Sequence, residues 1–366
     1  GSAPPEIDRP AIAGRRIVKH FDFNEAPLGN YEPLPMFWRR YGGQGFPLYL
    51  EGRFDPQVGR AAAPSFRLDL DGGSLAYHYE GRDISVRTNS YYLVVAWVRT
   101  AGLISARAYM TAYYLDRKGT PIPGAEGRSI LVGGSGGPTE WEPITVALPG
   151  NVPGSRYIGI SLWLTQSSIW RTTPPSPREI VREDVKATAW FDDITVYRLP
   201  RVALSSSRPG NVFQTDEPVE LRTEVTDPDG LNLTAQLEIR DADGRLVRTL
   251  PVGISTEDAP RVERHDLGEL PVGLYHAELQ VSTGPTLLVR REMRFARLAP
   301  ASGSPQESGR RFGLVLRSAA GELLEGQRDL LSRIRLSYTK LPIWSVQAAA
   351  AGASPAIDRI ADRYLE

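Results

Sequence analysis

The chain has 366 residues, which exceeds what one ordinary hydrophobic core needs and predicts two or three domains. Its 43 basic and 43 acidic residues cancel, so no net field attracts nucleic acid or an anionic membrane, and we expect neither as a partner. The sequence has no cysteine and four scattered histidines, which excludes disulfides, zinc–thiolate sites and thiol nucleophiles, and no apolar run has the length of a membrane span.

Residues 1–14 are expected to form a flexible, tag-like start. Gly1 and Ser2 resemble a vector remnant on a start from which any signal peptide has been removed, and we expect an extracellular or periplasmic location. Beyond this segment, 35 glycines and 30 prolines separate short runs rich in Val, Leu, Tyr and Thr. This composition is typical of many short strands joined by turns, so the fold class is expected to be mainly β.

Residues 15–200 contain eight strand-like runs between turn signals. They are "RRIVKHFDF", "SFRLDLDGG", "SLAYHYEG", "YYLVVAWVRT", "ARAYMTAYYLD", "WEPITVALPG", "YIGISLWLTQ" and "WFDDITVYRL". Eight such strands predict a two-sheet β-sandwich of the jelly-roll kind.

Residues 201–298 form a second unit with about seven expected strands and tight D-G turns, which predicts an immunoglobulin-like sandwich. Its "DPDG" and "DADG" stretches resemble fragments of calcium loops. Neither completes the spaced series of carboxylates that such a loop needs, so we interpret both as hairpin turns.

Residues 299–311 are small, polar and Pro-containing, and predict a linker. In residues 312–366 the pattern changes to strand, helix, strand, helix, beginning with "RFGLVLRS" and "YTKLPIWS" as the strands. Two β-α units predict the opening of a parallel α/β domain. Two units cannot close a barrel, so we expect the chain to be a fragment or a processed product.

Alternation along three strands gives each an apolar face and a mixed face of rings, hydroxyls and guanidinium groups, because successive strand residues point to opposite sides. Rings that stack on the apolar face of a sugar, beside polar groups that bond its hydroxyls, suit a carbohydrate ligand. The alternative, that these rings are buried under loops or between domains, stays open. The candidate sugar-binding residues on these strands are Trp97, Arg99, Arg107, Tyr109, Tyr113 and Trp163.

The stretch "FWRRYGGQGFPLYLEGRFD", residues 37–55, holds six aromatic rings without a helical or strand period. Its position in a long loop predicts loop anchors, with Trp38 as a candidate for the rim of a sugar site. Trp170 lies in a similar loop-like segment and is a second rim candidate, although a structural role is the alternative for both.

Residues 15–200, which open with "FDFNE" and close with "AWFDDITVYRLP", resemble the jelly-roll carbohydrate-binding modules of bacterial polysaccharide-active proteins. The resemblance implies a structural calcium ion where the first and last strands meet. It makes Asp193 the first candidate ligand, with Asp22 and Glu25 as further ones. The alternative is that Asp192 and Asp193 end a strand and that one of them pairs with an arginine.

The last segment resembles the first two β-α units of a TIM-barrel glycoside hydrolase, whose catalytic carboxylates lie at the ends of later strands. No catalytic pair is assignable in this chain, and whether the full-length protein is an enzyme stays open. We therefore expect a non-catalytic carbohydrate-binding and spacer region of a larger polysaccharide-active protein, with polysaccharide and the rest of the barrel as partners. The alternative is a structural or adhesion region whose sandwiches pack on the barrel or on another protein.

Overall fold

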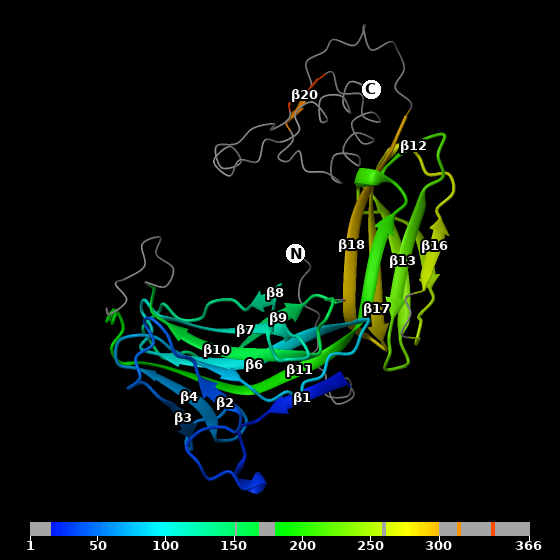
Figure 1. Cartoon of the computed structure of the whole chain (residues 1–366). Coiled ribbons are helices and arrows are strands. Elements are labelled where there is room, and N and C mark those ends of the chain that lie inside the picture. The colour runs from blue at the N-terminus through cyan, green and yellow to red at the C-terminus, as the bar shows by residue number, and fades with distance from the viewer. Residues whose placement is uncertain are drawn as a thin grey trace.

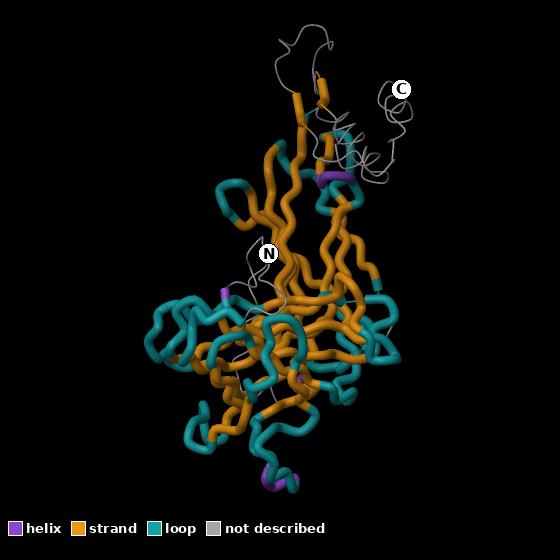
Figure 2. Tube along the Cα trace, turned by 60° about the vertical axis from the view of Figure 1, so that its left-hand side comes forward, coloured by secondary structure: helices purple, strands orange, loops and turns teal. Residues whose placement is uncertain are grey.

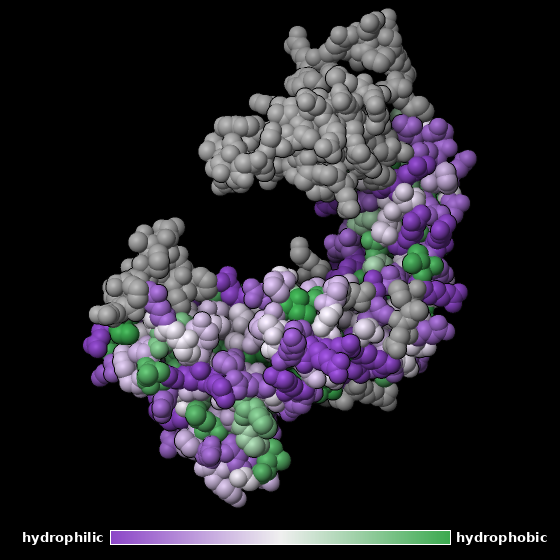
Figure 3. Space-filling model, in the orientation of Figure 1, coloured by the Kyte–Doolittle hydropathy of each residue, from purple (hydrophilic) through white to green (hydrophobic). Residues whose placement is uncertain are grey.

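The computed structural model describes residues 16–150, 152–167, 180–257 and 261–299, and the backbone of 313–315 and 338–340. Strands dominate these residues, as predicted, and form two β-sandwiches, one rising from an end of the other (Figures 1 and 2). Two short 3₁₀ helices, η1 (Ala26–Leu28) and η3 (Pro209–Asn211), lie between strands. The face seen in Figure 3 is mainly hydrophilic, with small separate hydrophobic areas.

The first sandwich consists of two sheets, and most successive strands change sheet; the exceptions are β3 with β4 and β7 with β8, which pair within one sheet. One sheet contains, in spatial order, β3 (Gly52–Asp55), β4 (Ser65–Leu70), β11 (Ala187–Ser206), β6 (Ser90–Ala101) and β9 (Glu142–Leu148), with β1 (Ile17–Phe21) also paired to β11. The facing sheet contains β2 (Trp38–Arg40), β5 (Leu75–Tyr79), β10 (Tyr157–Thr165), β7 (Arg107–Leu115) and β8 (Pro121–Arg128).

The core between these sheets is built from the apolar residues that alternation predicts. On β10 the inward residues are Ile158, Ile160, Leu162 and Leu164, and all four are fully buried. Each large aliphatic side chain buried in this way stabilises the fold by about 1.5–3 kcal/mol relative to exposure. The polar and aromatic residues between them must then face outward, away from the opposite sheet.

Strand β11 is 20 residues long and belongs to both sandwiches. Its first part pairs with β4, β1 and β6, and its last part, from Arg201 to Ser206, pairs with β13 (Glu220–Thr226). The boundary expected between residues 200 and 201 therefore falls inside one continuous strand. A strand that hydrogen-bonds on both sides of a domain boundary leaves no flexible linker there.

The second sandwich has a smaller sheet of β11, β13 and β16 (Val262–Asp266). Its larger sheet contains, in order, β12 (Val212–Gln214), β18 (Thr286–Leu298), β17 (Gly273–Thr283), β14 (Thr234–Asp241) and β15 (Leu246–Val252). The core of this sandwich includes Leu93 and Leu199, which come from β6 and β11 of the first sandwich. Apolar packing therefore continues across the junction.

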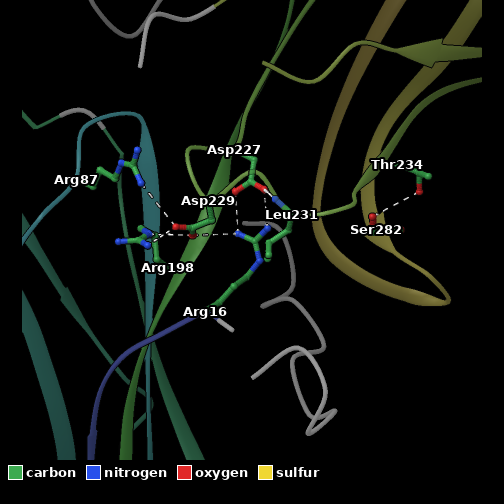
Figure 4. A network of polar contacts seen from close by, with 8 residues as sticks. All are labelled: Arg16, Arg87, Arg198, Asp227, Asp229, Leu231, Thr234 and Ser282. Carbon is green, nitrogen blue, oxygen red and sulfur yellow. Dashed lines mark hydrogen bonds and ion pairs between the residues drawn. The ribbon is translucent and has the colours of Figure 1, made fainter. Parts of the chain in front are cut away.

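A buried ion pair also joins the two sandwiches. Arg16, which directly precedes β1, donates two hydrogen bonds to Asp227 at 3.1 and 3.0 Å, and both side chains are 1% exposed (Figure 4). Asp229, two residues further on, accepts hydrogen bonds from Arg198 and lies 3.8 Å from Arg16. These hydrogen bonds offset part of the cost of removing the charges from water, while Nε of Arg16 is buried without a partner among the described residues.

Asp227 and Asp229 belong to the "DPDG" stretch that was interpreted as a hairpin turn, and this interpretation is wrong. The stretch connects β13 to β14, which lie in different sheets, and its carboxylates hold the first sandwich. The other stretch, "DADG", does form the hairpin between β14 and β15, with Asp241 accepting hydrogen bonds from the backbone of Asp243 and Arg245.

The expected α/β domain falls largely outside the described residues. Strands β19 (Gly313–Val315) and β20 (Tyr338–Lys340) lie where "RFGLVLRS" and "YTKLPIWS" predict strands, and they pair in parallel. The two expected helices and the linker residues 300–311 are not among the described residues, so the barrel stays a prediction.

No helix in the described ranges is long and apolar enough to cross a membrane.

We predict that Arg16→Met lowers the free energy of unfolding by about 3–5 kcal/mol, because Asp227 then stays buried without its partner. Urea denaturation followed by circular dichroism measures this change. Arg245→Met is the matched control, since Arg245 faces Asp243 at 3.9 Å with both side chains largely exposed, and its effect should stay below about 0.5 kcal/mol. Equal effects of the two substitutions would contradict a stabilising role for the buried pair.

Candidate functional site

The outward face of the sheet β2-β5-β10-β7-β8 carries a row of polar side chains across all five strands. Ser161 on β10 lies directly opposite His78 on β5 and Thr111 on β7. Arg39 extends the row at one end and Arg128 at the other. This register places hydroxyl, imidazole and guanidinium groups side by side on one surface.

An aromatic group lies next to this polar row, two residues along the strands. Trp163 stacks on its cross-strand partner Tyr109, with ring centroids 5.8 Å apart and an interplanar angle of 3°. The indole N–H of Trp163 donates to the hydroxyl of Thr111 at 2.9 Å. Tyr109 is buried, whereas Trp163 is partly exposed, so Tyr109 supports the indole and Trp163 presents it to solvent.

A second ring lies on the other side of the polar row. Tyr113 on β7 faces Gly159 on β10, and a Cβ at Gly159 would come within 2.3 Å of the Tyr113 ring. Glycine is therefore required for this ring to lie across β10. The Tyr113 hydroxyl is 3.3 Å from that of Ser161, and burial raises the pKa of Tyr113, so the phenol stays protonated and can donate.

Five residues of this face line a pocket of about 570 Å³, namely His78, Thr111, Tyr113, Ser161 and Trp163. Ligand pockets commonly measure ~300–1,000 Å³ and combine apolar walls with a few polar groups. The charged lining residues differ in their bonding. Glu80 pairs with Arg39 at 3.1 Å and lies 3.3 Å from His78. The side chains of Arg82 and Glu126 are exposed and make no hydrogen bond or ion pair to other described residues. Those two groups are available to a ligand.

Of the predicted sugar-binding residues, the structure brings Tyr109, Tyr113 and Trp163 together on this face. It does not bring Trp97 and Arg99 there, because β6 lies in the opposite sheet. The expectation of one face shared by all three strands is therefore wrong. Alternation predicts which residues share a side of one strand, but not which sheet the strand joins.

On the opposite sheet the rings are capped by arginines. The guanidinium of Arg60 lies 3.6 Å from the ring centroid of Trp97. Those of Arg67 and Arg99 lie 5.4 and 5.8 Å from that of Trp190. Cation–π contacts of this kind occupy ring faces that a sugar would need.

The remaining sugar-site candidates lie elsewhere. The guanidinium of Arg107 donates to the backbone carbonyls of residues 104, 105 and 106, so it closes a loop. Trp38 is buried in the core against Phe21, Phe66 and Tyr79 and cannot act as an exposed rim. Trp170 lies outside the described residues.

Sequence reasoning missed two rings of the site, both from residues 37–55. The Tyr41 ring lies 5.3 Å from Trp163 and also lines the pocket, and Phe46 packs against both rings. The segment "YGGQGF" turns back on itself through a bridge between Gly43 and Phe46, which brings the two rings together. The glycines between two aromatic residues were the available signal for this turn.

Each of the three carboxylates expected to bind calcium accepts a hydrogen bond within the protein. Asp193 lies at an irregularity of β11 with a φ of 47° and pairs with Arg60. Asp22 accepts a hydrogen bond from the backbone of Asn24, and Glu25 accepts one from that of Met36. In the part of the chain that the structure describes, no group of three or more acidic, histidine or cysteine side chains is arranged to hold a metal ion.

The buried neighbour of Asp193 has a perturbed acidity. Asp192 is 2% exposed, and burial raises its pKa to about 6 from the usual value of 3.8. Backbone N–H groups of Arg60 and Asp193 bond its oxygens at 2.7 and 2.8 Å and lower the pKa, while the charges of Asp193 and Asp22 raise it. The folded state therefore holds this proton more tightly than the unfolded state does.

No protein-family model matches the chain, and no curated protein matches it. Among solved structures, the N-terminal CBM22-1-CBM22-2 tandem domain of Paenibacillus barcinonensis Xyn10C is 10% identical over 54% of this chain and 52% of that one, with a TM-score of 0.33. The CBM22-GH10 modules of Clostridium thermocellum endo-1,4-beta-D-xylanase 10B are 15% identical over 50% of this chain and 28% of that one, with a TM-score of 0.31. The active domain of tailspike protein 4 of bacteriophage CBA120 is 11% identical over 45% and 20%, with a TM-score of 0.32. The chain covers less than two thirds of each of these three structures.

We predict that the carboxyl of Asp192 stabilises the fold at low pH and that this contribution is lost as the pH rises from about 4 to about 6. The difference in unfolding free energy between wild type and Asp192→Asn should therefore shift by on the order of 2 kcal/mol in favour of the variant between about pH 4 and pH 7. Urea denaturation across this pH range tests it. Asp71→Asn, which changes an exposed carboxyl, is the matched control, and equal pH profiles for the two variants would contradict the assignment.

Proposed function

We propose that the first sandwich is a carbohydrate-binding module that holds a glycan on the outward face of the sheet β2-β5-β10-β7-β8. The observation that carries the proposal is the pocket in which Trp163, Tyr113 and Tyr41 surround the hydroxyls of Ser161 and Thr111. A sugar ring has an apolar C–H face and a rim of hydroxyls. Aromatic faces beside hydroxyl and charged groups complement both features at once.

The position of the second sandwich supports sugar binding over the structural alternative. The described residues that line the pocket all belong to the first sandwich, whereas the second sandwich packs on Leu93 and Leu199 of β6 and β11 in the opposite sheet. Its core therefore does not reach the rings of the site. The alternative, a structural or adhesion role, would require a further domain or partner to seat on the pocket face.

The rest of the chain completes the proposal. We assign to the second sandwich an immunoglobulin-like fold and the role of a spacer, and to the residues after it the start of a TIM-type barrel of a polysaccharide-active protein. Such a protein meets its polymer outside the cytoplasm, so we propose an extracellular or periplasmic location. Binding near the polymer raises the effective concentration of substrate for any attached catalytic part.

We predict that the protein is retarded in affinity electrophoresis by at least one polysaccharide of a broad panel, and that Trp163→Ala weakens this binding at least about tenfold, or ~1.4 kcal/mol. Tyr41→Ala should weaken this binding as well. It should disturb the fold less than Trp163→Ala does, because Tyr41 is 40% exposed. Circular dichroism verifies that each variant is folded.

The matched control is Tyr31→Ala, which removes a ring that is 86% exposed and does not line the pocket. It should leave the migration unchanged. Unchanged migration of the wild type on every polysaccharide would sink the proposal, as would equal losses for Tyr31→Ala and Trp163→Ala.

We predict that Glu126→Gln weakens glycan binding about tenfold, because a hydrogen bond to a charged group contributes about 1.5–3 kcal/mol. Glu126 lines the pocket and pairs with Tyr113 in the register of β7 and β8, and its carboxylate has no hydrogen-bond or ion-pair partner among the described residues. Isothermal titration calorimetry with the bound glycan measures the change. Glu140→Gln, an exposed carboxylate outside the pocket, should leave the dissociation constant unaltered.

A further inference from the structure

The place where β1 meets β11 is where the resemblance implies a structural calcium ion. Two carboxylates, Asp192 and Asp193, do lie there, beside the register shift of β11 between Asp192 and Thr195. Calcium takes six to eight oxygen ligands, usually from several carboxylates, carbonyls and waters. The bonding of each carboxylate oxygen therefore decides whether these residues fit the ion.

The carboxylate oxygens at this place are already bonded within the protein. One oxygen of Asp193 accepts from the Arg60 guanidinium at 3.0 Å, and the other lies 3.7 Å from Nε2 of His20. The two oxygens of Asp192 accept the backbone N–H groups of Arg60 and Asp193. Calcium would have to compete with a resident cation at Asp193 and with two backbone donors at Asp192.

The other two candidate ligands, Asp22 and Glu25, also accept hydrogen bonds within the protein. Asp22 receives the N–H of Asn24 in a local turn. Glu25 receives the amide of Asn30 and the N–H of Met36, so it organises the loop after η1. These residues do not fit the calcium site that the resemblance implies.

Arg60 is held in place by three contacts at once. Its backbone N–H bonds Asp192, its guanidinium bonds Asp193, and the same guanidinium stacks on Trp97 at 3.6 Å. A guanidinium is planar and weakly hydrated, so it can stack on a ring and bond a carboxylate together, which an ammonium group does less well. The loop between β3 and β4 thus places the guanidinium of Arg60 in a fixed position beside β11.

We infer that Arg60 takes the place of the structural cation at the junction of β1 and β11, so that the first sandwich folds and keeps its stability without calcium. The inference assigns roles to three residues. Arg60 is the cation, Asp193 is its counter-ion, and Trp97 is the surface on which it rests. This inference does not depend on the proposed sugar binding.

The test is thermal unfolding of the whole chain in excess chelator and in millimolar calcium, followed by circular dichroism. We expect the same Tm in both conditions. A ligand that binds only the folded state raises Tm as its concentration exceeds its Kd, so a higher Tm in calcium than in chelator overturns the inference.

The variant Arg60→Gln should lower Tm by at least about 3 °C in both conditions, because Asp193 loses its counter-ion and Trp97 its stacking partner. Arg60→Lys keeps the charge and should lower Tm less, which gives a measurement even where the glutamine variant does not fold. The matched control is Arg53→Gln on the same sheet face, whose pair with Asp69 is half exposed, and it should change Tm by less than half as much. If Arg60→Gln behaves like the control, the inference fails.

Discussion

The constraint on which the rest of the structure depends is the continuity of β11. This strand forms hydrogen bonds with β4, β1 and β6 in the first sandwich and with β13 in the second. The same strand is therefore part of a sheet in both sandwiches. The Arg16–Asp227 pair and the burial of Leu93 close the same junction from either side of the strand. Separating the two sandwiches would expose apolar surface, leave buried charges unpaired and break the hydrogen bonds between β11 and β13. The free energy needed to open the junction is therefore the sum of these three contributions.

This arrangement also separates the two faces of the first sandwich by role. The sheet that contains β6 and β11 packs its outward face on the second sandwich and caps its tryptophans with arginines. Among the described residues no such cover lies on the outward face of the other sheet, whose rings and hydroxyls line the pocket. This difference between the two sheets follows from the topology. Strand β11 belongs to one sheet of the first sandwich, so the second sandwich that it continues into lies against that sheet and not against the other.

Local patterns in the sequence were sufficient for some of these features. Alternation along β7 and β10 separates Tyr113 and Trp163 from the buried aliphatic residues, because period-2 patterning is a property of a single strand. The assignment of β6 to the other sheet, the burial of Trp38 and the pairing of Arg60 with Asp193 depend on contacts between residues far apart in the chain. No window of sequence contains such contacts, and the turn-like composition of "DPDG" does not distinguish a hairpin from a connection between sheets.

The stack of Trp163 on Tyr109 has a consequence for how a ligand would be received. The indole is fixed before any ligand arrives, by a ring beneath it and by the hydrogen bond from its N–H to Thr111. Ordering a free side chain on binding costs about 0.5–1.5 kcal/mol, and here folding has already ordered it. Differences in affinity between glycans would then depend on how well each sugar matches a rigid surface rather than on how far the surface adapts to the sugar.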